Sequence, residues 1–437
     1  MLNSVSNIKP YNYNMVALKK SNTSNVVTSS FTSNSARQPV LNIRTELTTK
    51  IEKQKYNELL KNVDKTSRKQ LDLLLKNGVL LNSNSNDNST VLDNLHNMII
   101  NPRAEGLNAK NLLKDTISTI SYPFVITQQF GDIPDRYRKI AISANQNDAE
   151  IDVEHSGTCV AASIEFNMAE QMPAEFARFA ERLSSPDLQV KKEIKLSNLS
   201  DDVGEAISLL NIFNIPNETN NFNTSTLTFA PDKNAIIRAV IQTTDRDPLE
   251  RSPLDVLMQS TFMQVGSQQS YNTLTDKRAK GEFNQNDKGL VEYEKTFVES
   301  VVEDKNKMSV VYQTVDDNAR LIGYETDKET LKKQLVDTLN SGSNIIVGYT
   351  QVDNNNIIIN GHEITIIGYK YDSNNKLIFI CNDTDDDISK PIEYGEDYLL
   401  PKIHHAGLPQ KIASSTIDST PNWVVGLEMY KNMRNGK

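Results

Sequence analysis

The sequence contains very little cysteine: only Cys159 and Cys381 occur among 437 residues. Two thiols exclude a disulfide-stabilised scaffold and favour a reducing compartment. Long apolar runs are also missing, because no stretch approaches the roughly 20 apolar residues of a membrane helix. The N-terminus lacks the apolar segment of a secretory signal. We therefore expect no membrane partner, and either a cytoplasmic location or export without a recognisable signal peptide.

Positive charge is scarce as well. The chain has 47 Lys and Arg against 56 Asp and Glu, a formal net charge of -9, and no basic block that would attract nucleic acid. Metal-binding patterns are weak: the acidic run 383–387 lacks the glycine of an EF-hand loop, and the pair His404–His405 has no accompanying cluster. We expect no nucleic-acid partner and no metal or other cofactor.

The first 120 residues divide into two parts. Residues 1–42 are rich in Ser, Asn and Thr, a composition typical of disorder. Residues 43–120 carry apolar side chains at helix spacing and predict a helical module, with helices over about 42–63, 65–76, 89–101 and 108–120. We expect a permanently buried structural layer; the alternative is a pro-segment-like cover over an active site.

The remaining residues, 121–437, combine helices with a strand-rich last third. We expect an extended run over 122–134, strands over 225–231 and 236–243, helices over 252–269 and 326–342, and strands over 344–350, 362–371 and 376–383. A capping box of Thr326 and Glu329 would begin the second helix, and a turn over 372–375 would join the last two strands. Together these elements predict an α+β fold.

One cysteine has a position suited to catalysis. Cys159 follows the short turn Ser156-Gly157-Thr158 and opens a run of small and apolar residues with helical character. Ser156 or Thr158 would cap the helix by accepting from its free backbone N–H groups. A thiol at that place lies at the positive end of the helix dipole, which favours the nucleophilic thiolate. Cys381, in the middle of a predicted strand, is expected to be a packed thiol.

A cysteine nucleophile needs a base and a group that orients the base. His362 follows Gly361 at the start of an apolar strand, from which its side chain can reach across a cleft. Reflection through the turn near residue 374 places its strand partner near residue 386, so the orienting residue is expected at the end of the next strand. Asp383 is the preferred candidate and Asn382 the alternative.

These segments resemble the papain-like cysteine peptidases. "SGTCVAAS" corresponds to the family's Gly-x-Cys at the start of its central helix, and "NGHEITIIGY" followed by "IFICND" corresponds to its His strand and Asn or Asp strand. The resemblance covers residues 156–166 and 342–383 and implies a papain-like core: a helix bearing the Cys packed on an antiparallel sheet bearing the His and the Asp or Asn. The longer spacing implies an insertion around 190–325, within a papain-like domain over 121–437.

The resemblance also implies an activity. Cys159 would be the nucleophile, His362 the base and Asp383 or Asn382 the orienting residue, in thiol-dependent hydrolysis of peptide or isopeptide bonds through an acyl-enzyme. Protein or peptide would be the substrate. Two alternatives stay open: transglutaminase-like amide transfer, and a catalytically inactive module that binds peptides.

One catalytic group of the family is displaced in this sequence. The family usually has a Gln six residues before the Cys, where it donates a hydrogen bond to the oxyanion, but here that residue is Val153. Acyl transfer needs such a donor beside the backbone N–H of the nucleophile. We expect Gln128 to supply it, with Gln129, Gln146 and His155 as alternatives.

Overall fold

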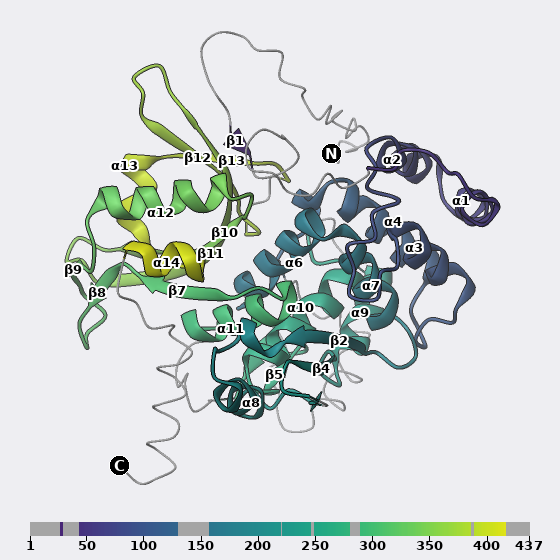
Figure 1. Cartoon of the computed structure of the whole chain (residues 1–437), viewed down its shortest axis with the longest axis horizontal. Coiled ribbons are helices and arrows are strands. Elements are labelled where there is room, and N and C mark those ends of the chain that lie inside the picture. Colours follow the sequence, from purple (N-terminus) through teal and green to yellow (C-terminus); the bar gives the residue numbers. More distant parts are fainter. Residues whose placement is uncertain are drawn as a thin grey trace, which may run out of the picture.

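The protein combines a helical half with a half built on an antiparallel sheet, in this computed structural model (Figure 1). The predicted α+β class is confirmed. The structure describes residues 27–28, 43–129, 157–219, 221–245, 249–279, 289–385 and 389–416. The helix α6 (Cys159–Gln171) lies where the two halves meet (Figure 1).

The N-terminal helices form close to their predicted positions. They are α1 (Lys50–Asn62), α2 (Lys65–Lys76), α3 (Val91–Ile100) and α4 (Ala109–Ser121). The first begins at residue 50, later than predicted, because Thr49 and Glu52 form a capping box there. Thr90 and Asp93 form a second capping box at the start of α3.

The N-terminal helices share one hydrophobic core with the helix that carries Cys159. Leu59, Leu71, Leu74, Leu92 and Leu95 are buried in the same cluster as the apolar residues of α6. The helices α3 and α4 also contact α7 (Pro173–Leu183), the helix that directly follows α6. These contacts place residues 43–120 against the helical core.

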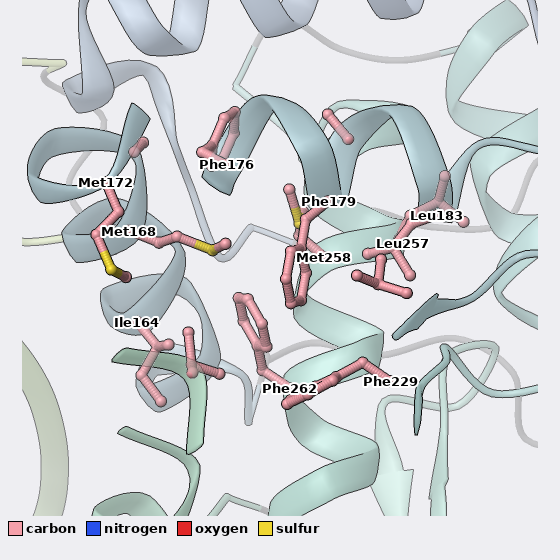
Figure 2. Close-up of a cluster of buried hydrophobic side chains, with 14 of the residues drawn as sticks. Ile164, Met168, Met172, Phe176, Phe179, Leu183, Phe229, Leu257, Met258 and Phe262 are labelled. Atoms are coloured by element: carbon pink, nitrogen blue, oxygen red, sulfur yellow. The ribbon is translucent and has the colours of Figure 1, made fainter. Parts of the chain in front are cut away.

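The centre of this core is formed by α6, α7 and α10 (Pro253–Gly266), which confirms the helix predicted over 252–269. Every residue of α6 from Val160 to Ala169 is buried, as expected of a helix enclosed on all sides. The side chains that meet there are Ile164, Met168, Met172, Phe176, Phe179, Leu183, Phe229, Leu257, Met258 and Phe262 (Figure 2). The start of α6 is therefore held by a packed helical frame.

The segment between α7 and the large sheet contains small strands and further helices. They are β2 (Val190–Lys195), α8 (Val203–Ile212), β3 (Asn217–Glu218), β4 (Thr224–Phe229), α9 (Ala235–Asp245), β5 (Tyr271–Asn272), β6 (Lys277–Arg278) and α11 (Glu292–Glu303). The strand predicted over 225–231 is confirmed as β4. The strand predicted over 236–243 is wrong, because this stretch belongs to α9 and buries Ala235, Arg238, Ala239 and Gln242 at helical spacing.

Six antiparallel strands form the main path of the large sheet, in the order β13-β12-β11-β10-β14-β7. Their bounds are β7 (Lys307–Val311), β10 (Ile345–Val352), β11 (Ile358–Tyr371), β12 (Leu377–Asn382), β13 (Ile392–Gly395) and β14 (Ile403–Pro409). The three strands predicted from residue 344 onward are confirmed as β10, β11 and β12, but β11 begins at Ile358, so His362 lies inside this strand and not at its start as predicted. A separate hairpin is formed by β8 (Gln313–Val315) and β9 (Leu321–Tyr324).

Helices flank the large sheet. Contacts with α6 and α11 come from the helical half, while α12 (Lys328–Asn340) and α14 (Gln410–Thr416) pack with the sheet and with each other at the left of Figure 1. The helix predicted over 326–342 is confirmed as α12. Its predicted capping box is wrong, because Asp327 caps it and accepts from the backbone N–H groups of Glu329 and Thr330.

Of the first 42 residues, the structure describes only residues 27 and 28. Val27 and Thr28 form the short strand β1, which pairs with Tyr369 and Gly368 of β11 beyond the end of β10. The rest of the tail predicted to be disordered lies outside the described residues.

In the part of the chain that the structure describes, no helix combines the length and the apolar character needed to cross a membrane.

The contribution of the N-terminal helices to stability can be measured with a pair of leucine variants. Leu95→Ala removes a fully buried side chain of the shared core and should lower the free energy of unfolding by about 2–5 kcal/mol. Leu73→Ala, at a position 38% exposed in α2, is the control and should cost far less. Urea unfolding measures both. Equal small losses would show that these helices are not part of the stabilising core.

Candidate active site

Cys159 is the first residue of α6, and its side chain is partly exposed. Thr158 occupies the N-cap position as predicted, but the predicted capping bond is wrong: its side chain makes no capping hydrogen bond and donates instead to Gln259 Oε1, at 3.1 Å. The preceding residue is also held, because the backbone N–H of Gly157 donates to Asp276 Oδ2 at 2.8 Å. The two residues before Cys159 are thus held in place by Gln259 and Asp276, which fixes the start of α6.

His362, inside β11, meets Asp383, the residue that follows the end of β12. The Nε2 atom of His362 lies 2.7 Å from Oδ1 of Asp383, and each side chain is 10% exposed. A register irregularity between Ile366 and Gly368 makes Thr365 the partner of Asn382. This register places Asp383 diagonally across from His362, within reach of a side-chain hydrogen bond.

The side chain of Cys159 also lies close enough to interact with His362. Burial on its own would lower the pKa of His362, but the hydrogen bonds with Asp383 and Cys159 and the charges of both residues raise the pKa well above its usual value. Because Asp383 holds Nε2, Nδ1 is the ring nitrogen left for the sulfur. The raised pKa favours the protonated imidazole, which can stabilise negative charge on the sulfur.

Of the two candidates for the orienting residue, the structure brings Asp383 to His362. Successive strand residues point to opposite faces of a sheet, so Asn382 points away from the histidine. Asn382 is buried opposite Thr365, and its Nδ2 atom has no hydrogen-bond partner among the described residues.

Tyr349 is a further residue at this site, and the sequence analysis did not identify it. It is paired with His362 across β10 and β11, and the two rings lie 5.6 Å apart in an edge-on arrangement. Burial, followed by the charge of Asp383, raises the pKa of Tyr349. The pairing register could have revealed this contact, because it places an aromatic side chain directly opposite the histidine.

Gln128 lies beside the end of β12. Its backbone N–H donates to the carbonyl oxygen of Thr384 at 3.0 Å, and its Oε1 atom accepts from Thr384 Oγ1, also at 3.0 Å. Gln128 is 5% exposed. The alternative candidate Gln129 turns instead to Asp385, whose carboxylate oxygen lies 2.8 Å from its Nε2 atom.

The remaining oxyanion candidates, Gln146 and His155, lie outside the described residues, as does Val153. The extended run predicted over 122–134 is wrong in part, because Pro123–Val125 forms a turn of 3-10 helix. Proline favours the first position of such a turn. From residue 126 to residue 129 the chain passes along the end of β12, where it contacts Thr384.

A buried set of charges lies directly behind the histidine strand. Glu363, next to His362, pairs with Lys295 of α11 at 3.2 Å and with His405 of β14 at 2.8 Å. Burial raises the pKa of Glu363, but the charges and hydrogen bonds of Lys295 and His405 outweigh it and lower the pKa to about 2. Gly348 leaves the room for this cluster, since an added Cβ would lie 2.2 Å from the ring of His405.

His405 thus ties β14 to β11, and His404 contacts His405. Among the residues that the structure describes, no group of three or more His, Cys, Asp or Glu side chains could hold a metal ion.

Comparison of the chain with protein-family models, with curated proteins and with solved structures finds no match. The geometry of Cys159, His362 and Asp383 is therefore the basis for a function.

The raised pKa of His362 predicts a pH-dependent stability. The protonated imidazole is bound more tightly in the folded state, so its stabilisation is complete below the unfolded pKa of about 6.5 and is lost as the pH rises through the folded value. Asp383→Asn should therefore destabilise the protein most below the unfolded pKa of about 6.5, and progressively less as the pH rises through the folded pKa of His362. Urea unfolding at several pH values measures the difference.

The matched control for this experiment carries His362→Ala. In that background, the effect of Asp383→Asn should lose its pH dependence. A loss of stability that is the same at every pH in the wild-type background would show that Asp383 does not hold the protonated histidine.

Proposed function

We propose that this protein is a cysteine peptidase-like hydrolase with a papain-like core, which cleaves peptide or isopeptide bonds through an acyl-enzyme on Cys159. The observation that carries the proposal is the position of His362 between two partners. Asp383 holds the Nε2 atom of the ring at 2.7 Å, and Cys159 lies close enough to raise the pKa of the imidazole. This is the arrangement in which a histidine activates a thiol and later protonates a leaving amine.

The architecture supports the same proposal. A buried helix begins with the cysteine and packs on an antiparallel sheet, and adjacent strands of that sheet carry the histidine and the aspartate. The elements from β2 to α11 account for the unusually long separation between the cysteine and the histidine. The helices α1 to α4 are an addition on the helical side.

The chemistry follows from these positions. The sulfur of Cys159 attacks the carbonyl carbon, and the negative charge moves to the carbonyl oxygen. The proton on Nδ1 of His362 passes to the leaving amine as the carbon–nitrogen bond breaks, which leaves a thioester on Cys159. His362 then takes a proton from water, which attacks the thioester, and the acid leaves as the thiol is restored. Asp383 keeps the ring oriented throughout.

Gln128 is the side chain best suited to stabilise the oxyanion. Thr384 holds its Oε1 atom, so the Nε2 group is the end that can donate to a substrate. The backbone N–H of Cys159, in the first turn of α6, is the natural second donor. Removal of one such donor typically slows acyl transfer about a hundredfold or more.

The second cysteine is not suited to this role. Cys381 lies in β12 and is fully buried, and burial, together with the charge of Asp383, raises the pKa of its thiol. A buried thiol of this kind is a packing residue rather than a nucleophile. It provides an internal control for the catalytic experiment.

The proposal is tested with a library of fluorogenic peptides and an activated ester as substrates. Turnover should disappear in Cys159→Ala and persist in Cys381→Ala, because only the first variant removes the sulfur close to His362. Addition of a primary amine distinguishes hydrolysis from amide transfer, which would yield the amide product in place of the acid. Peptide binding without any turnover in the wild-type protein would instead establish a non-catalytic binding module.

A further inference from the structure

A single buried glutamine contacts both segments that form the candidate site. Gln259, in the middle of α10, is fully buried. Its Oε1 atom accepts from Thr158 Oγ1 at 3.1 Å, and its Nε2 atom donates to the backbone carbonyl of Thr127 at 2.9 Å. Thr158 directly precedes the nucleophile Cys159, and Thr127 directly precedes Gln128.

The remaining contacts of Gln259 fix which way its amide points. Arg251 Nη1 approaches the Oε1 atom at 3.4 Å, and the Nε2 atom also donates to Glu165 Oε2 at 3.0 Å. Burial and the charge of Asp255 raise the pKa of Glu165 well above its usual value. The oxygen of the amide therefore faces donors, and its nitrogen faces two oxygen acceptors.

No other natural side chain of this size meets these requirements. A glutamate would place a second oxygen against the Thr127 carbonyl and Glu165. A methionine would fill the same volume but leave the Thr127 carbonyl and the Thr158 hydroxyl without this partner. Buried polar networks of this kind define one arrangement of the groups that they join, because an unmade bond in the interior is costly.

We propose that Gln259 is a positioning residue for acyl transfer, which sets the place of the Gln128 amide relative to the sulfur of Cys159. This inference depends on the proposed function, because it concerns the same reaction. Gln259 does not touch the substrate. It joins the start of α6 to residues 127–128, so that the nucleophile and the oxyanion donor are fixed against one side chain of α10.

The test is Gln259→Met, assayed on an activated ester such as a p-nitrophenyl ester and on alkylation by iodoacetamide. A misplaced oxyanion donor should lower kcat by about tenfold to a hundredfold and leave KM little changed. Alkylation of Cys159 forms no oxyanion and should keep its rate. The matched control is Gln264→Met in the same helix: Gln264 is also buried but donates to the Tyr271 carbonyl, so turnover should not change.

A second comparison separates positioning from general stability. In a Gln128→Ala background the donor is already lost, so adding Gln259→Met should cause little further loss of kcat. Hydrogen exchange should be faster in Gln259→Met over residues 126–129 and 157–160 and unchanged elsewhere. If Gln259→Met does not fold, the pair Thr158→Val and Thr158→Ser replaces it: loss of the hydroxyl should lower kcat, and serine should restore it.

The outcomes distinguish the two proposals. A wild-type protein that turns over no ester or peptide overturns both of them before any variant is assayed. An active wild-type protein whose kcat is equal in Gln259→Met and Gln264→Met overturns the positioning role alone. The positioning role is also overturned if Gln259→Met slows alkylation of Cys159 as much as it slows turnover. It is overturned as well if the double variant of Gln128→Ala and Gln259→Met loses kcat by the product of the two single losses.

Discussion

The hydrogen bond between His362 and Asp383 is the contact on which the candidate site depends. It joins β11 to the residue that follows β12, at 2.7 Å, and leaves only one nitrogen of the imidazole for Cys159. Because the cysteine comes from α6 and the other two residues come from the sheet, the site exists only where the two halves of the molecule pack together. Folding and assembly of the site are therefore one event.

Both halves are held at this junction by buried polar groups rather than by apolar packing alone. On the sheet side, Glu363 ties the histidine strand to Lys295 and His405. On the helical side, Gln259 holds the residue before Cys159. Buried charges and amides add little net stability, and breaking one is costly, so their main effect is to favour one arrangement over close alternatives. A catalytic site needs that uniqueness, because its groups act over fractions of an ångström.

The parts of the fold that could be predicted are those with strong local signals. The strands β10, β11 and β12 have apolar runs bounded by turns. The helix at Cys159 follows the turn-forming residues Ser156-Gly157-Thr158. The segment over 236–243 was misassigned because its β-branched residues favour a strand, whereas its burial has helical spacing in the folded protein.

The sequence predicted the three central residues of the candidate site, Cys159, His362 and Asp383, but not the residues that hold them in place. Reflection through the turn placed the partner of His362 near residue 386; the irregularity near Ile366 shifts the register by one residue, and the diagonal contact across the two strands brings in Asp383. Gln259 and Lys295 could not be found in this way, since each reaches the site from a helix whose position is set by tertiary packing. The hydroxyl of Thr158 was assigned to a helix cap because local sequence cannot reveal a partner 101 residues away.

The most direct test of this account is detection of the acyl-enzyme. The protein is mixed with an activated ester, quenched in acid within the first turnover, and measured by intact mass followed by peptide mapping. The account predicts a mass increase equal to one acyl group, located on Cys159 and absent from Cys159→Ala. An adduct on another residue, or turnover with no adduct on Cys159 under conditions in which deacylation is slow, would contradict it.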